Sequence, residues 1–381
     1  MRAITSLLGC AIASAFSFGI TPAHGATIWV ATNGTDSTTC GPNRSQPCRS
    51  ISAGIAHANI GDLVLVGPGR YGDIDGDLQY VTPGDETPDL GLGCLVCITK
   101  RVTLASTDGA DLTVIDPGRP GGGQSFPPEL RNTVLITASG VRFGAAAQGF
   151  SVYGLPSGAL AVDSAGDIRV ISNVTYGGGV GMDLNTLNGP LYVAQNRLLN
   201  AESGGLSVGL RNSQATVLEN FAAGSAFAGG IHVGVSELGA ASPPLVANNR
   251  ALGNNLGFSF FSSPPGNNIR FTIASNVASG NKRGFASETS SLLFQRNTAI
   301  GGLEGFTVTG QPGWPDNSFH TNNMIGNHRC GFWNRGVANV DATNNFWGSA
   351  AGPGPKPSDQ VCNEPPDVAS TKVIPFATRA F

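Results

Sequence analysis

A short pattern of apolar and polar positions recurs along the chain: an apolar residue, two variable residues, then asparagine. Seven clear copies and a looser eighth end at Asn173, Asn196, Asn220, Asn249, Asn276, Asn297, Asn322 and Asn344. The spacing is 21 to 29 residues. Six to 10 residues after each of the first seven asparagines comes a glycine with an apolar residue behind it. Two linked signals with one period predict a solenoid of repeated coils.

The runs that follow the glycines, such as Ile231–Val235, alternate inward and outward as β-strands do. Glycine and asparagine are too frequent for helical repeats, and the LxxLxL core of leucine-rich repeats is absent. Two or three short β-runs per repeat describe one coil of a parallel β-helix, and we expect about eleven coils. Asparagine and glycine tolerate the positive φ that sharp corners need. Because coils stack at ~4.8 Å, we expect the asparagines to form a hydrogen-bonded ladder above a core of Phe and Val.

This pattern resembles that of the right-handed parallel β-helix proteins of the pectate-lyase-like superfamily. Pro47–Ala58 resembles the short helix that caps such solenoids, Gly61–Tyr71 their first coil, and Asn344–Pro353 the closing motif of many bacterial members. The resemblance covers roughly residues 27–355. It implies an all-β, right-handed parallel β-helix with a short N-terminal capping helix. Since the fold carries lyases, hydrolases, esterases, epimerases and inert surface proteins, it does not select a function.

The chain divides into three expected parts. Residues 1–25 have the features of a signal peptide: Arg2, an apolar run from Ile4 to Ile20, and small residues before the cleavage point. A retained membrane anchor and a lipoprotein modified at Cys10 are the alternatives. Residues 26–355 are expected to form the β-helix, with 71–98 as an inserted loop, and 356–381 a tail that packs on the solenoid. No later segment is apolar enough to span a membrane.

Six cysteines remain after removal of the signal peptide, and an even number in an exported chain favours disulfides. Proximity suggests the pairs Cys40–Cys48, Cys94–Cys97 and Cys330–Cys362, although about fifteen pairings are possible. The CxxC segment at Cys94 also allows a redox pair or a zinc site, but a βαβ context and a second ligand pair are missing. We therefore expect a secreted or periplasmic protein.

Charge narrows the range of partners. Only 12% of residues are charged and the net charge is −3, which gives no electrostatic case for nucleic acid or an acidic membrane surface. With 40% apolar residues, the chain is not of disordered composition. We expect a monomer whose partner is a polysaccharide.

Projection of the post-glycine strands places two columns of side chains on the outer face. The first column is Gly181, Ser207, His232, Ser259, Ala286, Thr307 and Trp333, and the second is Asp183, Gly209, Gly234, Phe261, Glu288, Thr309 and Arg335.

From these columns we take His232, Glu288 and Asp183 as candidate catalytic residues. Phe261, Trp333 and Arg335 are candidate substrate-binding residues. His232 and Glu288 are expected ~10 Å apart, and Asp183 and Glu288 nearer ~20 Å. The columns are otherwise mostly Gly, Ser, Ala and Thr, which equally describes an ordinary solvated face.

The motifs that would name an enzyme class are missing. The adjacent aspartates and the Gly-His-Gly of the family's hydrolases are absent, and we find no arginine cluster of the kind its lyases use beside calcium. Two hypotheses therefore stand. One is a protein that binds or processes an extracellular polysaccharide; the alternative is a non-catalytic surface or structural β-helix, similar to an adhesin.

Calcium is the one cofactor that the sequence suggests. Asp73, Asp75 and Asp77 alternate in a glycine-containing loop, and calcium prefers such oxygen ligands. Gly76 comes too early for an EF-hand, so a polar turn without an ion is the alternative. A second group of His320, His328, Arg329 and Trp314 forms either a binding patch or a cover for the end of the solenoid.

Overall fold

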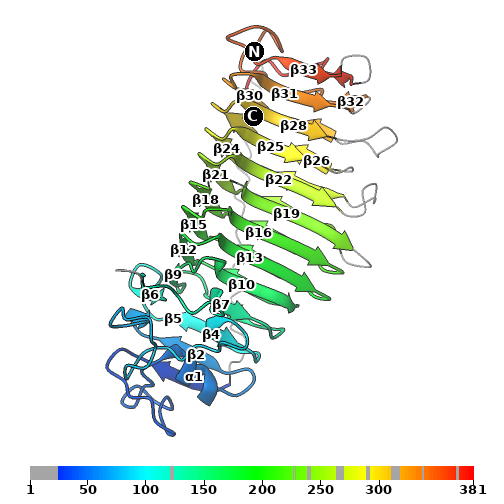
Figure 1. The fold of residues 1–381 in the computed structure, drawn as a ribbon. Helices are drawn as coiled ribbons and strands as arrows, with labels where there is room; N and C mark the ends of the chain where they lie inside the picture. The colour runs from blue at the N-terminus through cyan, green and yellow to red at the C-terminus, as the bar shows by residue number, and fades with distance from the viewer. Residues whose placement is uncertain are drawn as a thin grey trace, which may run out of the picture.

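The computed structural model describes residues 25–120, 124–225, 227, 229–237, 242–262, 270–288, 292–309, 318–336, 339–365 and 369–381. The expected signal peptide, apart from Gly25, lies outside these residues, and so does Trp314. Figure 1 shows an elongated stack of strands with a short helix, α1 (Ile51–His57), at the N-terminal end.

Three sheets of parallel strands run along the stack, and equivalent strands of successive coils are hydrogen-bonded neighbours. In spatial order, the first sheet contains 13 strands: β1 (Thr27–Val30), β2 (Leu63–Val66), β5 (Thr103–Ser106), β8 (Arg142–Phe143), β11 (Ile168–Ile171), β14 (Leu191–Ala194), β17 (Ala215–Leu218), β20 (Leu245–Ala247), β23 (Phe271–Ala274), β26 (Leu292–Gln295), β29 (Ser318–His320), β32 (Val340–Asp341) and β34 (Thr371–Lys372).

The second sheet contains 11 strands and carries the candidate site: β4 (Cys94–Ile98), β7 (Asn132–Ile136), β10 (Gly158–Ala165), β13 (Val180–Leu187), β16 (Gly204–Arg211), β19 (Gly229–Glu237), β22 (Leu256–Ser262), β25 (Arg283–Ser287), β28 (Glu304–Thr309), β31 (Cys330–Arg335) and β33 (Val361–Glu364). The third sheet contains 10 strands: β3 (Gly69–Gly72), β6 (Thr113–Asp116), β9 (Ser151–Tyr153), β12 (Val174–Tyr176), β15 (Arg197–Leu199), β18 (Phe221–Ala223), β21 (Arg250–Leu252), β24 (Val277–Ser279), β27 (Thr298–Ile300) and β30 (Asn323–Ile325).

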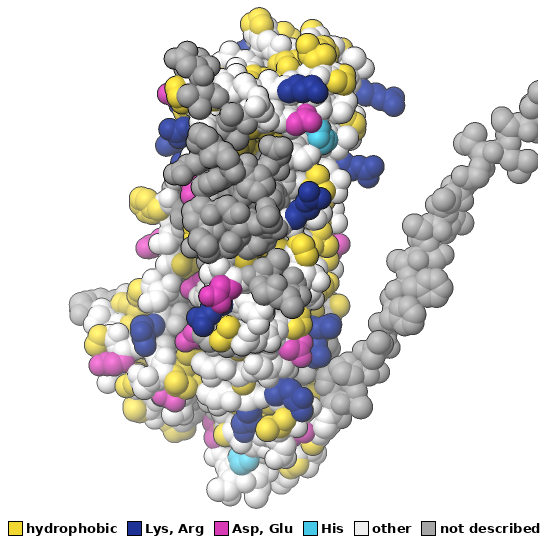
Figure 2. All heavy atoms as spheres, turned by 90° about the vertical axis from the view of Figure 1, so that its right-hand side faces the viewer, with side chains coloured by type: hydrophobic (Ala, Val, Ile, Leu, Met, Phe, Trp, Pro, Cys, Tyr) yellow, Lys and Arg dark blue, Asp and Glu magenta, His cyan; other side chains and the backbone are white. Residues whose placement is uncertain are grey.

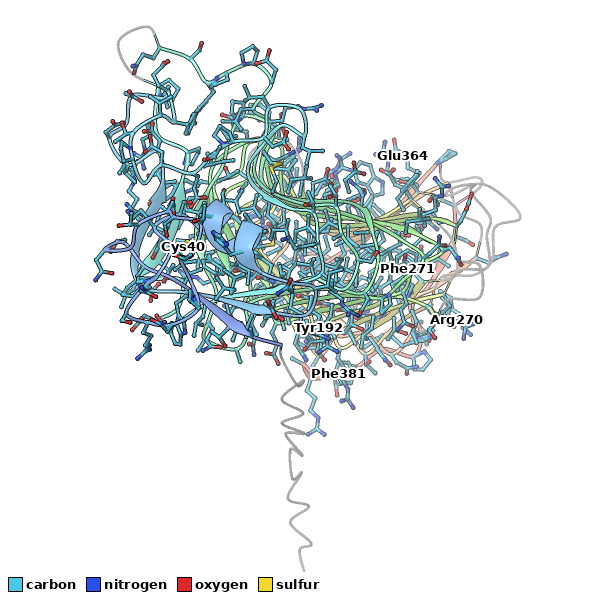
Figure 3. The ribbon with its side chains drawn as sticks, turned by 90° about the horizontal axis from the view of Figure 1, so that it is seen from below. Cys40, Tyr192, Arg270, Phe271, Glu364 and Phe381 are labelled. Carbon is cyan, nitrogen blue, oxygen red and sulfur yellow. A yellow bond between two sulfur atoms is a disulfide. The ribbon has the colours of Figure 1, made fainter. Side chains whose placement is uncertain are left out.

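The order of strands confirms the expected all-β parallel β-helix. From β10 to β32 the chain visits the second, first and third sheets in turn, and each such round makes one coil. The expected capping helix is also present: α1 begins after Ser50, whose hydroxyl accepts a hydrogen bond from the Ala53 amide. Figure 3 looks along the stack from this end, with α1 in front of the coils.

Apolar side chains of equivalent strands stack inside the coils. In the C-terminal half the stack is aromatic: the ring of Phe285 lies 4.8 Å from that of Phe258 and 4.7 Å from that of Phe306. Phe294 and Phe319 stack at 4.5 Å on the first sheet. These rings are essentially fully buried, and rings at such distances add to the free energy gained by burial.

The expected asparagine ladder is confirmed. From Asn173 to Asn322, each ladder asparagine donates from its backbone amide to the side-chain oxygen of the next, at 2.8–3.0 Å. The eighth member is Asn345, not the expected Asn344. Asn344 instead has a φ of 60°, and the residue before each ladder asparagine has a similar positive φ, from Ser172 to Thr321. The ladder residue is therefore the one that follows the corner.

The three disulfides suggested by proximity are present: Cys40–Cys48, Cys94–Cys97 and Cys330–Cys362. The chain leaves the coil over residues 73–93, a shorter insertion than the expected 71–98, because Cys94–Ile98 is already a strand of the second sheet. Strands β33 and β34 extend two sheets, so the tail continues the solenoid. No helix within the described ranges is long and apolar enough to cross a membrane.

Candidate functional site

A shallow groove crosses the outer face of the second sheet, with a volume of about 390 Å³. We call it the central groove. Strands β13, β16, β19 and β22 form it. Apart from the buried Thr186, its polar and aromatic lining residues are Asn185, Ser207, Arg211, His232, Ser236 and Phe261. Alternate residues of each strand point outward, so neighbouring strands supply side chains at the same level of the groove.

Two glycines make the floor of the central groove. Gly209 and Gly234 are paired in register on adjacent strands. A Cβ at Gly234 would lie 3.1 Å from Cδ1 of Phe261, and one at Gly209 would lie 2.3 Å from Oδ1 of Asn185. Any larger residue would therefore displace a lining side chain, and glycine keeps the backbone open to a ligand.

The strand register brings two of the candidate residues into one column. Asp183 pairs with Ser207, and Ser207 pairs with His232. The projection from sequence put Gly181 next to Ser207 in the first column. This prediction is wrong by two residues, because Asp183 is the residue that pairs with Ser207. Gly181 is buried, and the apolar residue that aligns with the inward positions is Met182, which is fully buried, rather than Val180. Asp183 and His232 are thus two strand spacings apart, ~10 Å.

His232 is mostly buried beside an aromatic ring. Its imidazole stacks with Phe261 at 6.4 Å, with 25° between the ring planes. Burial lowers the pKa of His232, and the charges of Glu288 and Asp183 oppose that shift without reversing it. The imidazole is therefore neutral at neutral pH and keeps one nitrogen lone pair available. Phe261 is 39% exposed, so part of its ring faces solvent.

Glu288 is exposed and follows the last residue of β25. Its backbone amide donates to the Phe260 carbonyl at 3.1 Å, which fixes it one strand beyond Phe261. Glu288 also acts electrostatically on His232. His232 and Phe261 therefore line the central groove, whereas Asp183 and Glu288 lie to either side of them and are not among its described lining residues.

Trp333 and Arg335 lie elsewhere. Four strand spacings, ~19 Å, separate His232 from Trp333 along the column. Trp333 is only 6% exposed, and the guanidinium carbons of Arg329 and Arg335 lie 3.9 and 4.6 Å from its ring centroid. Arg329 also pairs with the buried Glu304 at 3.5 Å. This second cluster leaves little aromatic surface for a ligand.

The acidic loop gathers a different set of carboxylates from the expected one. Asp73, Asp75 and Asp85 have oxygens within 4.8 Å of one another, whereas Asp77 does not join them. Asp73 accepts hydrogen bonds from the amides of Gly76 and Leu78, and Asp85 from those of Ile74 and Thr82. Burial raises the pKa of Asp73 and a hydrogen bond from Thr82 lowers that of Asp75. Backbone amides and the Thr82 hydroxyl of the same loop donate to these carboxylates.

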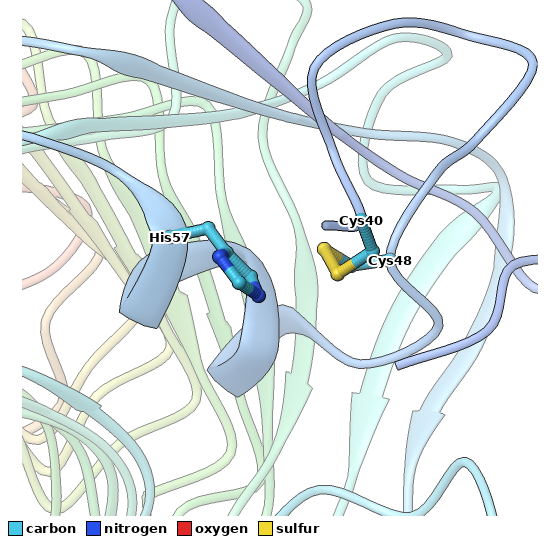
Figure 4. A group of neighbouring side chains, drawn as sticks. All are labelled: Cys40, Cys48 and His57. Atoms are coloured by element: carbon cyan, nitrogen blue, oxygen red, sulfur yellow. A yellow bond between two sulfur atoms is a disulfide. The ribbon is translucent and has the colours of Figure 1, made fainter. Parts of the chain in front are cut away.

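Cys40, Cys48 and His57 also lie together, beside α1 (Figure 4). The two sulfurs are bonded to each other, and Nε2 of His57 is 2.9 Å from the Ser37 carbonyl. A disulfide does not ligate a metal as a thiolate does, so this group is structural.

His320 and Arg329, two members of the group expected near the C-terminal coils, lie on different sheets. His320 lies on the first sheet, where Nδ1 is 2.9 Å from the Thr343 carbonyl and Nε2 is 3.8 Å from Oδ2 of Asp341. Arg329 belongs to the Trp333 cluster on the second sheet. Figure 2 shows charged side chains scattered over one face of the solenoid rather than gathered into a patch of one sign.

Three groove residues were missed by the projection from sequence. Asn185, Arg211 and Ser236 lie two residues beyond the columns projected, on strands of eight or nine residues. A strand length cannot be read from the glycine motif alone. A third outward column, two residues further along, would have included all three.

Comparison with known proteins shows the fold and no closer relationship. No protein-family model and no curated protein matches the chain. A rhamnogalacturonan lyase of known structure has a TM-score of 0.53 at 14% identity, over 94% of this chain and 89% of that one. A pectate lyase gives 0.45 at 15% identity over 93% and 79%, and a periplasmic alginate epimerase 0.40 at 11% over 84% and 85%. The chain therefore has the parallel β-helix fold of the pectate-lyase-like proteins.

Proposed function

We propose that this protein binds a polysaccharide in the central groove and processes it with His232 as the base. The observation that carries the proposal is a neutral imidazole beside a partly exposed aromatic ring, above a glycine floor. A groove that crosses several parallel strands suits a chain-like ligand better than a compact one, because successive strands supply lining side chains along its length.

The lining has the chemistry that sugars require. Ser207, Ser236 and the Asn185 amide offer hydrogen bonds to hydroxyl groups, and Phe261 offers a face for the apolar side of a sugar ring. The similarity to a rhamnogalacturonan lyase supports polysaccharide processing only at the level of the fold. This support is limited, because one fold carries many functions.

Each candidate residue has a role that its surroundings allow. A neutral His232 can accept a proton from the substrate or from water, which is the role of a general base. Glu288 is exposed one strand beyond Phe261, and we assign to it a second proton exchange with a ligand that extends past that ring. Asp183, ~10 Å from His232, leaves room for a bound sugar between them.

Export fits this role. Three disulfides join the six cysteines beyond residue 25, and such bonds persist in oxidising compartments. Together with the expected signal peptide, they support a secreted or periplasmic protein that meets its polysaccharide outside the cytoplasm.

One observation favours a non-catalytic role instead. Asp183 and Glu288 are four strand spacings apart, ~19 Å, which exceeds the roughly 5–10 Å between paired carboxylates of glycoside hydrolases. Catalysis in the groove therefore depends on His232. A surface protein that only binds glycan would use the same groove but would not need a base at position 232.

A depolymerisation assay tests the proposal. The protein would be incubated with a panel of polysaccharides while reducing ends and the ultraviolet absorbance of unsaturated products are measured. His232→Ala should reduce the rate by at least about a hundredfold, the contribution typical of a general base, and Glu288→Gln should also reduce it. Glu202→Gln, an exposed glutamate between β15 and β16, is the control and should match the wild type.

The results separate the two roles. Products that disappear in His232→Ala with folding retained support an enzyme. Glycan binding without products, unchanged in His232→Ala but lost in Phe261→Ala, supports the binding protein. A folded protein that neither binds nor cleaves any polysaccharide would overturn both.

A further inference from the structure

We infer that the central groove takes a neutral glycan rather than a polyanionic one such as a polyuronate. The inference rests on the function proposed above and narrows it to a class of substrate. It follows from the balance of charges on the outer face of the second sheet, taken together with the hydroxyl and amide groups of the lining.

Among its described lining residues, the groove offers a carboxylate-bearing chain one cation, and that cation is already paired. Arg211 is the single Lys or Arg among the lining residues. Its guanidinium already lies 3.7 Å from a carboxylate oxygen of Glu237, and both side chains are well exposed. A polyuronate would have to compete with Glu237 for this one group.

The surroundings of the groove are acidic. Asp183 is two strands from His232 in the same column, and Asp163 pairs in register with Asn185 from the strand next to it. Glu288 lies beyond Phe261 on the other side. Each carboxylate of an incoming polyuronate would meet these like charges, which costs free energy that salt partly screens.

A bridging calcium ion would not offset this repulsion. Calcium takes oxygen ligands at 2.3–2.6 Å, so the carboxylates of one site must lie within a few ångströms of one another. Asp183 and Glu288 are ~19 Å apart by strand spacing. Among the described residues, the group of three carboxylates whose oxygens lie within 4.8 Å of one another is in the loop after β3, away from the groove strands.

The same surface suits a neutral chain. Hydroxyls of Ser207 and Ser236 and the amide of Asn185 donate and accept hydrogen bonds without a net charge. Gly234 exposes the edge of Phe261 at the floor, so the apolar face of an uncharged sugar ring can lie against carbon.

Paired polymers test the inference. Homogalacturonan in fully methyl-esterified and de-esterified forms shares one backbone and differs in charge. Xylan, galactan and glucomannan extend the neutral set, and alginate the acidic set. Binding would be measured by calorimetry at low and at physiological salt. We expect a neutral polymer to bind at least about tenfold more tightly than any acidic one at low salt, where ten-fold corresponds to about 1.4 kcal/mol.

Salt gives a second, independent signature. Binding of the neutral polymer should change little with salt, whereas residual binding of the acidic polymers should strengthen as salt screens the repulsion. Phe261→Ala should weaken neutral binding at least about tenfold, which places it in the groove. Tighter binding of an acidic polymer that weakens with salt and depends on Phe261 would overturn the substrate class but leave the proposed function standing. Absence of binding by either class would overturn both.

Discussion

Among single residues, Glu86 shows how the inserted loop holds the N-terminal cap. Its fully buried carboxylate accepts hydrogen bonds from the Ile51 amide at 2.6 Å and from the amide and hydroxyl of Ser52 at 2.7 and 2.6 Å. These donors are at the start of α1, where backbone amides have no partner within the helix. Burial raises the pKa of Glu86 to about 7, although these hydrogen bonds favour the charged form.

This raised pKa predicts a pH-dependent stability. The unfolded value is 4.5, so between about pH 4.5 and 7 the folded protein binds the extra proton. Stability is then highest at the acidic end and falls as pH rises through the folded pKa, by up to about 3 kcal/mol for this group. Glu86→Gln should abolish that fall. Urea unfolding followed by circular dichroism at pH 5, 6, 7 and 8 measures it.

The test uses the difference in the pH dependence of stability between the wild type and Glu86→Gln. Other groups with shifted pKa values, such as Asp359 and His232, titrate in both and cancel. Glu202→Gln should keep the wild-type profile because this side chain is exposed. Parallel pH profiles for the wild type and Glu86→Gln would show that Glu86 has an ordinary pKa.

At the scale of elements, the corner of each coil depends on two consecutive residues. The first takes a positive φ, as Asn248 does at 57°. The second is the ladder asparagine, and Nδ2 of Asn249 donates to the carbonyls of Ala247 and Val217 and to Oδ1 of Asn276. The side chain thus closes the turn and ties it to the coils on either side.

Asn249→Ala should be strongly destabilising. It leaves the Asn220 amide and the Val217 and Ala247 carbonyls buried without this partner. Each unsatisfied group costs roughly 1–3 kcal/mol, part of which relaxation recovers, so we expect a loss of about 2–4 kcal/mol. Asn248→Gly is the matched control at the neighbouring position, where glycine adopts the positive φ freely. Thermal unfolding of both variants decides: equal melting temperatures would contradict a structural role for the ladder.

Sequence alone predicted the strands and the ladder because their spacing repeats, and it failed where the repeat changes. The sequence predicted Asn344 as the eighth ladder residue, whereas the structure has Asn345 there. Both residues are asparagine, and only the turn geometry distinguishes them. The shift at Asp183 arose because Val180 and Met182 are both apolar and only packing shows which points inward. Glu86 and Asp85 had no signal, because their contacts cross from an irregular loop to other segments.

A second ladder was also missed, for a related reason. The amide and side chain of Asn254 donate to Oδ1 of Asn281, and Asn327 donates to Asp359 in the tail. This ladder is interrupted at Gly302, whose amide donates to Asn327 directly. Three asparagines with a gap do not stand out from a chain rich in asparagine.

At the scale of the whole molecule, a solenoid is held by contacts between neighbouring coils, so its ends are the places where unfolding begins. Helix α1 and the Glu86 loop cover the N-terminal end. At the C-terminal end, β33 pairs with β31, and the Cys330–Cys362 disulfide joins the same two strands. Buried Asp359 accepts hydrogen bonds from Asn327 and ends the second ladder. The tail therefore closes the stack.

The Cys330–Cys362 disulfide at the C-terminal end should contribute more to the free energy of unfolding than the Cys40–Cys48 disulfide at the N-terminal end. Cys330–Cys362 closes a separation of 32 residues and Cys40–Cys48 one of 8. Chain entropy alone gives about 4 and about 2.5 kcal/mol, respectively. We therefore expect Cys330→Ser/Cys362→Ser to lose more stability than Cys40→Ser/Cys48→Ser.

Because coils unfold from an uncovered end, amide exchange in the Cys330→Ser/Cys362→Ser variant should rise first in β33 and β31 and leave β13 to β19 protected. Faster exchange spread evenly from β13 to β33 would instead mean that the stack unfolds as one unit and that the tail is not its cap.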